Sequence, residues 1–393
     1  MTRSVIVAGA RTPIGRFQGS FASLRAVDLG AIAIRAAFER AGVAPEQIEY
    51  TLMGHVLQAG QGQITARQAA IGAGIPKEIP AITINKVCPS GMAAIATADQ
   101  MIRAGELEIA VAGGMESMTA APFVLPKARE GARLGDTPML DSMIHDGLWC
   151  AFDDRHMGEG TDAINIELGI TREEQDAFAA RSHRLAADAW EAGRFDGEVV
   201  PVEVPQRTGD PVSVERDEGI RPETDMGALA RLRPAFTGDG TVTAGNASQI
   251  SDGACAVVVM SDRKAEELGL EPLALIEAYG MSADRFPSLQ TVPAVAAERA
   301  LKKVGRAASD LGVVEINEAF AAVPIHSARM LGVDPELVNV NGGAVALGHP
   351  IGASGARIVL TLALEMRRRG AELGAAAICG GGGQGDALVL ASG

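Results

Sequence analysis

The sequence predicts an α/β protein whose sheets are covered by helices. Short runs of Val, Ile and Ala alternate with alanine-rich amphipathic segments, a pattern typical of strands buried between helices. Similar segments recur in the same order after about 260 to 270 positions, which indicates a duplicated α/β unit. Three glycine-rich turns each hold one cysteine or histidine, so these turns are the first candidates for a functional site.

Each expected element follows from local composition. Strands are expected where short apolar runs meet turn residues, at Ser4–Ala8, Thr51–Met53, Ala81–Asn85, Ile109–Ala112, Ala254–Met260, Leu273–Tyr279, Val313–Ile316, Leu337–Val340 and Ala375–Cys379. The last of these is expected to be the final strand of the chain. Helices are expected where apolar residues recur at helical spacing, at Val27–Arg40, Gln63–Ala73, Met92–Ala104, Arg172–Ala192, Thr291–Val304, Ala319–Leu331 and Ser354–Arg369.

The long-interval repeat divides the chain into two halves. It relates Ser4–Ala8 to Leu273–Tyr279 and the turn at Cys88 to the turn at His349; coincidental similarity of glycine-rich strand ends is the alternative. The stretch between the halves is richer in charge, Pro and Met, as expected of an inserted loop domain that sets specificity. The predicted boundaries are 1–118 plus 246–270 for the N-terminal half, 119–245 for the loop domain and 271–393 for the C-terminal half.

Composition excludes several classes of partner. The 393 residues carry a formal charge of −14 and no compensating basic run, which argues against nucleic acid or an anionic membrane surface. No apolar run is long enough to span a bilayer and the N-terminus lacks a secretory pattern, so we expect a cytoplasmic protein. The cysteines form no CxxC pair, so neither a metal site nor a disulfide framework is expected; Cys150 and Cys255 are interpreted as inert.

The three turns contain groups suited to acyl chemistry. They centre on Cys88, His349 and Cys379. A thiol next to a base, or at a helix N-terminus that lowers its pKa, is a nucleophile, and closely spaced backbone N–H groups can stabilise an oxyanion. The structural alternatives are a core cysteine at a turn and a histidine with only a packing role.

The motifs around these turns resemble those of the thiolase family, in the family's order and over nearly the whole chain. They are Ala10–Gly15, Ala66–Ala70, Asn85–Met92, Gly113–Met118, His156–Gly158, Arg233–Phe236, Gly245–Ser248, Asn317–Phe320, Gly348–Gly352 and Cys379–Gly382. The resemblance implies a five-layered αβαβα fold with two buried sheets and a loop domain. It also implies a homotetramer built as a dimer of dimers.

The resemblance assigns catalytic roles to four residues. It implies that Cys88 is acylated, that His349 accepts its proton, and that Cys379 is the general acid and base of the second half-reaction. A water held by Asn317 would join His349 at one oxyanion site, and the backbone N–H groups of Cys88 and Gly381 would form the other. Asn317 as a plain turn residue is the alternative.

The resemblance also implies coenzyme A thioesters as substrates, with no separate cofactor. The expected partners are acetyl-CoA, acetoacetyl-CoA or other 3-ketoacyl-CoA molecules, and CoA. The expected CoA-binding residues are Leu148, His156, Met157, Arg221, Phe236, Ser248, Ala319 and Phe320; for Arg221, a solvated surface arginine is the alternative.

The sequence departs from the family pattern at three places. Pro89 replaces a frequent glycine, Gln249 follows Asn-Ala-Ser in place of glycine, and the stretch 158–165 differs after His156. The leading prediction is an acetyl-CoA C-acetyltransferase. A 3-ketoacyl-CoA thiolase for longer chains is the alternative, which Gln249 favours, and a non-catalytic acyl-CoA or lipid carrier is a distant one. A decarboxylating condensing enzyme and a cysteine hydrolase are disfavoured because neither would use Cys379.

Overall fold

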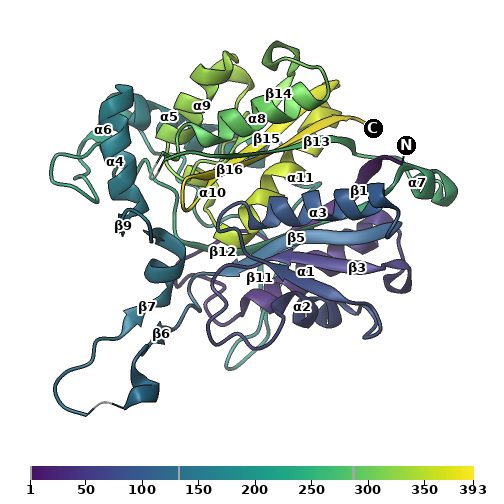
Figure 1. The fold of residues 1–393 in the computed structure, drawn as a ribbon, viewed down its shortest axis with the longest axis horizontal. Helices are drawn as coiled ribbons and strands as arrows, with labels where there is room; N and C mark the ends of the chain where they lie inside the picture. The colour runs from purple at the N-terminus through teal and green to yellow at the C-terminus, as the bar shows by residue number, and fades with distance from the viewer. Residues whose placement is uncertain (1, 132, 286–287) are drawn as a thin grey trace.

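Each half of the chain contributes a sheet, and the strand order is the same in both apart from the additional edge strand β4 in the first. The computed structural model describes residues 2–131, 133–285 and 288–393 (Figure 1). In the first half the strands run in the order β4 (Ala81–Ile84), β3 (Tyr50–Gly54), β5 (Ile109–Ser117), β12 (Ser251–Ser261) and β1 (Ser4–Arg11). In the second half they run in the order β14 (Val313–Ile316), β15 (Leu373–Gly380), β16 (Gln384–Ser392) and β13 (Ala274–Ala283).

The pairing pattern confirms the duplication. Strand β3 is parallel to β5, just as β14 is parallel to β15. Strand β12 is antiparallel to β5 and β1, just as β16 is antiparallel to β15 and β13. The two sheets meet where Ser4–Ile6 pair with Ala274–Ile276, so hydrogen bonding runs on from one half into the other.

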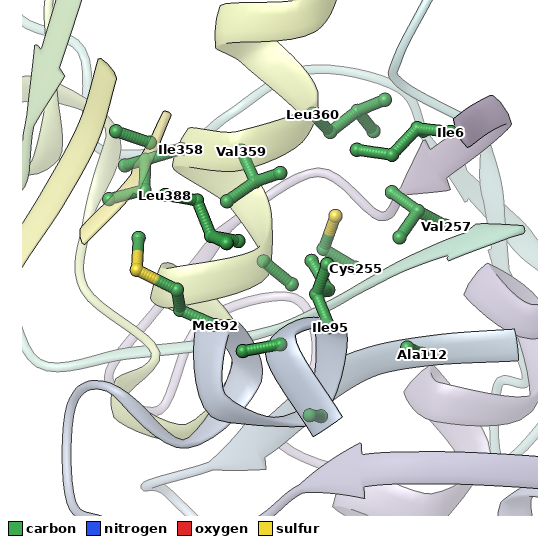
Figure 2. Packing of buried hydrophobic residues seen from close by; sticks show 14 of the residues in the cluster. Ile6, Met92, Ile95, Ala112, Cys255, Val257, Ile358, Val359, Leu360 and Leu388 are labelled. Atoms are coloured by element: carbon green, nitrogen blue, oxygen red, sulfur yellow. The ribbon is translucent and has the colours of Figure 1, made fainter. Parts of the chain in front are cut away.

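Helices form the other layers. The two central helices are α3 (Ser90–Ala104) and α11 (Ile351–Arg369). The outer face of the first sheet is covered by α1 (Ala26–Ala41) and α2 (Thr65–Ala73). The outer face of the second sheet is covered by α8 (Val292–Lys303) and α9 (Ala322–Leu331). One apolar cluster joins both sheets to α3 and α11, and two others join each sheet to its outer helices. In Figure 2, Met92 and Ile95 of α3 lie near Val359 and Leu360 of α11, with Ile6 and Val257 from the first sheet. The expected αβαβα arrangement is therefore confirmed.

Close backbone contact brings the first turns of α3 and α11 together. A Cβ atom added at Gly114 of β5 would lie 2.0 Å from the carbonyl oxygen of Gly352, and one at Gly91 would lie 3.0 Å from the same oxygen. Only glycine permits this approach. Since Cys88 and His349 immediately precede these two helices, the crossing sets their relative position.

The remaining elements are short or lie mainly between β5 and β12. They are β2 (Gly15–Arg16), η1 (Pro45–Gln47), β6 (Phe123–Val124), η2 (Ala128–Glu130), β7 (Leu140–Asp141), η3 (Met143–Leu148), β8 (Trp149–Cys150), β9 (Arg155–His156), α4 (Met157–Leu168), α5 (Arg172–Glu191), β10 (Val202–Val204), β11 (Val212–Val214), α6 (Met226–Ala230), α7 (Asp262–Leu268), η4 (Ala308–Asp310), η5 (Pro335–Leu337) and α10 (Ala344–Leu347). In Figure 1, β6 and β7 form the base of an arm that extends away from the layers. The predicted domain boundaries remain a prediction.

Two expectations about strands are wrong. Cys379 does not end the last strand region, because Gly382 and Gly383 take positive φ values of 76° and 69° in a tight turn and the chain returns as β16. The segment Leu337–Val340 is not a strand: Pro335 begins a short helix, and Val338 makes only an isolated bridge with Val314.

Within the described residues, no helix combines the length and apolar character that crossing a membrane requires.

Candidate active site

The structure brings the three glycine-rich turns around one small chamber. Its volume is about 50 Å³, and Cys88, His349 and Cys379 all line it. All three side chains are buried. The other lining residues are Leu148, His156, Met157, Ser248, Leu289, Ala319, Phe320, Ile351, Gly380 and Gly381.

Cys88 stands on a strained turn between β4 and α3. Val87 takes a positive φ of 54°, a conformation that is a genuine outlier for a β-branched residue. The turn is held because Asn85 Oδ1 accepts a hydrogen bond from the Val87 amide at 3.0 Å, and Ser90 Oγ donates to the Val87 carbonyl at 2.5 Å. Pro89 has a helical conformation and its carbonyl accepts from the Ala93 amide, so proline costs this turn no hydrogen bond.

Burial controls the ionisation of Cys88. Desolvation raises the pKa of the thiol to about 12, with a further contribution from the Glu116 carboxylate, although the backbone amides of Cys88 and Gly381 act in the opposite direction. The expected lowering of the thiol pKa by the helix N-terminus is therefore wrong for this chamber. In the free enzyme the backbone amides of Cys88 and Gly381 are directed at the Cys88 sulfur. Two amides directed at one point can stabilise a negative charge that develops close to it.

Hydrogen bonding fixes the tautomer of His349. Ser354 Oγ donates to the Pro350 carbonyl at 2.9 Å and lies 2.6 Å from His349 Nδ1. Because the hydroxyl proton is already used, Nδ1 carries the hydrogen and donates it to Ser354. The lone pair is then on Nε2, on the side of Asn317. Burial, with the Arg357 charge, lowers the pKa of His349 to about 3, so the ring is neutral near pH 7.

Asn317 follows β14 and lies beside His349, although it is not among the residues that line the chamber. Its Nδ2 lies 3.5 Å from His349 Nε2, and its backbone amide donates to the Ala377 carbonyl. The side chain is fully buried, and its Oδ1 is an acceptor without a partner among the described residues. A buried amide oxygen of this kind favours a bound hydrogen-bond donor, such as a water molecule.

Cys379 is the last residue but one of β15, and its thiol lies close enough to Cys88 for the two charges to interact. Burial raises the pKa of its thiol well above the ordinary value, and the charge of an ionised Cys88 raises it further. A Cβ at Gly380 would lie 2.5 Å from Pro89 Cδ, so the second cysteine's turn packs directly against the first. Both thiols are therefore neutral at rest, and only one of them can ionise readily at a time.

A larger cleft of about 450 Å³ adjoins the chamber. The two share Leu148, His156, Ser248, Ala319, Phe320, His349 and Ile351, while Arg221 and Phe236 line only the cleft and Met157 only the chamber. The structure thus brings all the predicted CoA-binding residues to one connected surface. His156 and Phe236 stack with ring centroids 4.6 Å apart, and Phe320 meets Phe236 edge-on. A thioester at the chamber can therefore extend a long substituent along the cleft.

The departures from the family pattern have structural reasons. Gln249 Nε2 donates to the backbone carbonyls of Gly219, Val345 and Ala346 at 3.0 to 3.2 Å. The backbone carbonyl of Gln249 accepts from the His349 amide. Gly158 lies in α4, where an added Cβ would lie 2.2 Å from the Phe236 ring. Gln249 thus supports the histidine turn rather than lining the acyl chamber.

Sequence reasoning missed several residues of the site. Ile351 and Leu289 line the chamber, Ser354 fixes the His349 ring, and the Ser251 hydroxyl accepts from the His349 amide at 3.1 Å. The spacing of Ser354, five residues after the histidine and in the first turn of α11, was the one signal available. Among the residues that the structure describes, no group of three or more His, Cys, Asp or Glu side chains is arranged to hold a metal ion.

Two thiols and an imidazole around one buried chamber are suited to acyl transfer through a cysteine. A family model described as the thiolase N-terminal domain matches residues 4–263, and one described as the thiolase C-terminal domain matches residues 270–392. The chain belongs to the thiolase family.

Curated relatives match over nearly their full length. A probable acetyl-CoA acetyltransferase of Mycobacterium tuberculosis is 57% identical over 393 residues, covering 100% of both chains. Acetyl-CoA acetyltransferases of Cupriavidus necator and Pseudomonas aeruginosa are each 52% identical, covering 99% and 98% of both chains.

Proposed function

We propose that this protein is an acetyl-CoA C-acetyltransferase, which condenses two acetyl-CoA molecules to acetoacetyl-CoA and CoA and also catalyses the reverse cleavage. The observation that carries the proposal is the chamber of about 50 Å³ that Cys88, His349 and Cys379 share. The names of the full-length relatives support it.

The first half-reaction acetylates Cys88. The sulfur attacks the thioester carbon of acetyl-CoA as its proton passes to His349 Nε2, whose lone pair is set by the Ser354 contact. Since the thiol pKa is about 12, proton transfer accompanies attack rather than preceding it. The backbone N–H groups of Cys88 and Gly381 stabilise the tetrahedral oxyanion, a contribution of roughly 100- to 1000-fold per donor. CoA then leaves with the proton of Cys379. The site now holds an imidazolium and a Cys379 thiolate, and their opposite charges offset the burial that keeps both groups neutral in the free enzyme.

The second half-reaction uses these two charges. The Cys379 thiolate takes a proton from the α-carbon of a second acetyl-CoA, and the resulting enolate oxygen is held by His349 Nε2–H and a water on Asn317 Oδ1. The enolate carbon attacks the acetyl group on Cys88, and the C–S bond breaks. The Cys88 sulfur recovers its proton from the imidazolium, which restores both neutral thiols.

The volume of the chamber favours a short acyl group. A cavity needs about 10–15 Å³ of such space to hold one water, so about 50 Å³ accommodates a group no larger than a few water molecules. A thiolase for longer chains would need more room beside Leu148, Met157 and Leu289. A carrier without turnover would have no need of three reactive side chains at one chamber.

Thiolysis with a substrate series tests the proposal. We expect kcat/KM to be at least about tenfold higher for acetoacetyl-CoA than for 3-ketohexanoyl-CoA or longer substrates. A preference for the longer chains would support the alternative thiolase, and absence of turnover with every substrate would support the carrier.

The outer cleft is proposed to hold CoA. Its apolar walls suit the pantetheine arm, and Arg221 lies at an exposed rim where a phosphate could reach it. Replacing Arg221 by alanine should raise KM for acetyl-CoA with little change in kcat.

The protein is further proposed to be a homotetramer. The arm between β6 and β7 exposes Phe123, Leu134 and Met139, and β4 is an edge strand of the first sheet with Ile82 exposed. Exposed apolar side chains and open sheet edges are typical of surfaces that associate. The mass of the assembly from light scattering decides between monomer, dimer and tetramer. A cytoplasmic location remains a prediction.

A further inference from the structure

One fully buried carboxylate takes no part in the reaction described above. Glu116 lies near the end of β5, within the motif Gly113–Met118, and its side chain is 0% exposed. Burying a carboxylate is costly unless its oxygens are hydrogen-bonded. The bonds that Glu116 makes therefore indicate what it is for.

Glu116 joins two segments that are far apart in the sequence. Its Oε2 accepts from the Gly352 amide, in the first turn of α11, at 3.1 Å and from the Val56 amide, after β3, also at 3.1 Å. Its Oε1 accepts from the Leu57 amide at 3.2 Å and lies 3.2 Å from His55 Nε2. Hydrogen bonds to an ionised acceptor are roughly twice as strong as neutral ones, and a negative charge at the start of α11 suits the helix dipole.

The same carboxylate reaches the turn of the nucleophile through two residues, Val56 and Asn85. The Val56 carbonyl accepts from Asn85 Nδ2 at 3.4 Å, and Asn85 Oδ1 accepts from the amide of Val87 at 3.0 Å. Val87 is the residue with positive φ directly before Cys88. One path of hydrogen bonds thus runs from the first turn of α11, through Glu116, Val56 and Asn85, to the turn that presents Cys88.

We propose that Glu116 is a positioning residue, which holds the His349 helix and the Cys88 turn in the relative position that acyl transfer requires. The inference rests on the proposed function, because the reaction sets the geometry that must be held. Glu116 touches neither the chamber nor the cleft, so it acts through the two turns and not on the substrate.

Glu116 also affects the ionisation of the Cys88 thiol. Its negative charge contributes to the raised pKa of Cys88. Removing that charge should make the thiol easier to ionise, whereas loosening the two turns should make acylation slower. Simple destabilisation would not move these two properties in opposite directions.

The test compares Glu116→Gln with Glu198→Gln. Glu198 is also a buried glutamate, but it pairs with Arg11 and Thr361 and is not among the groups that shift the pKa of Cys88. For each folded variant, the single-turnover rate of Cys88 acetylation by acetyl-CoA, KM, and the pH profile of Cys88 alkylation by iodoacetamide are measured. For Glu116→Gln we expect acetylation about 100-fold slower, KM within about twofold, and the alkylation profile displaced to lower pH. Glu198→Gln should leave all three unchanged.

A second variant covers the case in which Glu116→Gln does not fold. Asn85 is exposed, so Asn85→Ala tests the same path without a buried charge, and we expect about tenfold slower acetylation at unchanged KM. Normal acetylation in folded Glu116→Gln, or in Asn85→Ala when the first variant does not fold, would overturn the positioning role. If wild-type Cys88 itself took no acetyl group, the proposed function would fail instead.

Discussion

Replacing Gly114 by alanine is the perturbation whose consequence follows most directly from the crossing of α11 with β5. The new methyl carbon would lie 2.0 Å from the Gly352 carbonyl oxygen, 2.8 Å from its carbonyl carbon and 3.0 Å from Ala353 Cα. Ordinary contacts begin near 3.4 Å, so the helix would have to retreat by about 1.4 Å. No rotamer change relieves the contact, because every opposing atom belongs to the backbone.

The retreat should affect both stability and turnover. Overpacking of this kind costs about 1–3 kcal/mol, and a backbone clash belongs at the upper end of that range. His349 stands at the start of the same helix, and a misplacement of about 1 Å can cost 100-fold in rate. We therefore expect a loss of about 3 kcal/mol in unfolding free energy and about 100-fold in kcat for acetoacetyl-CoA thiolysis.

Urea denaturation and thiolysis kinetics at matched folded fractions measure the two effects. Gly238→Ala is the control, since a Cβ there would meet nothing within 4 Å and both properties should stay at wild-type values. Wild-type turnover and stability in Gly114→Ala would refute the claim that this crossing fixes the two catalytic turns.

Three further predictions concern the sulfur chemistry. Cys88→Ser should fold normally and lose more than about 1,000-fold in kcat, because a hydroxyl is far harder to ionise than a thiol; near-normal thiolysis would exclude Cys88 as the nucleophile. Cys379→Ala should slow condensation by about 100-fold or more and acetylation of Cys88 less, because the imidazolium can return its proton to CoA; the reverse order, in rapid-quench measurements, would contradict the assigned roles. The rate of Cys88 alkylation in the free enzyme should rise by about tenfold per pH unit from about pH 7 to 10, because the thiolate fraction grows with pH below a pKa of about 12; a plateau near pH 8 would show that burial does not govern this thiol.

The three turns that line the chamber could be found from the sequence because local features specify them. Each lies in a glycine-rich segment next to an apolar run, and the long-interval repeat places the Cys88 and His349 turns at equivalent positions. When two duplicated halves pack together, equivalent segments come to lie next to each other. Here the equivalent helices α3 and α11 pack together, which brings the turns before them close to each other. The same local reasoning identified the strands β1, β3, β5 and β12.

What sequence reasoning missed depends on distant contacts. Strand β16 was overlooked because its apolar run follows the glycine-rich Gly380–Gly383 turn, and only pairing with β15 and β13 makes it a strand. The bonds of Glu116 span 60 residues to Val56 and 236 residues to Gly352, so no spacing rule could indicate them. The raised pKa of Cys88 likewise arises from desolvation by several segments, whereas its position before a helix pointed the other way.

The covalent acetyl-enzyme is the feature on which the account depends. Mixing the full-length protein with acetyl-CoA, followed by intact-mass measurement and peptide mapping, tests it directly. The account predicts one acetyl group per chain, located on the peptide that contains Cys88 and lost again when free CoA is added. An unmodified chain, or an acetyl group located on Cys379 with Cys88 free, would contradict it.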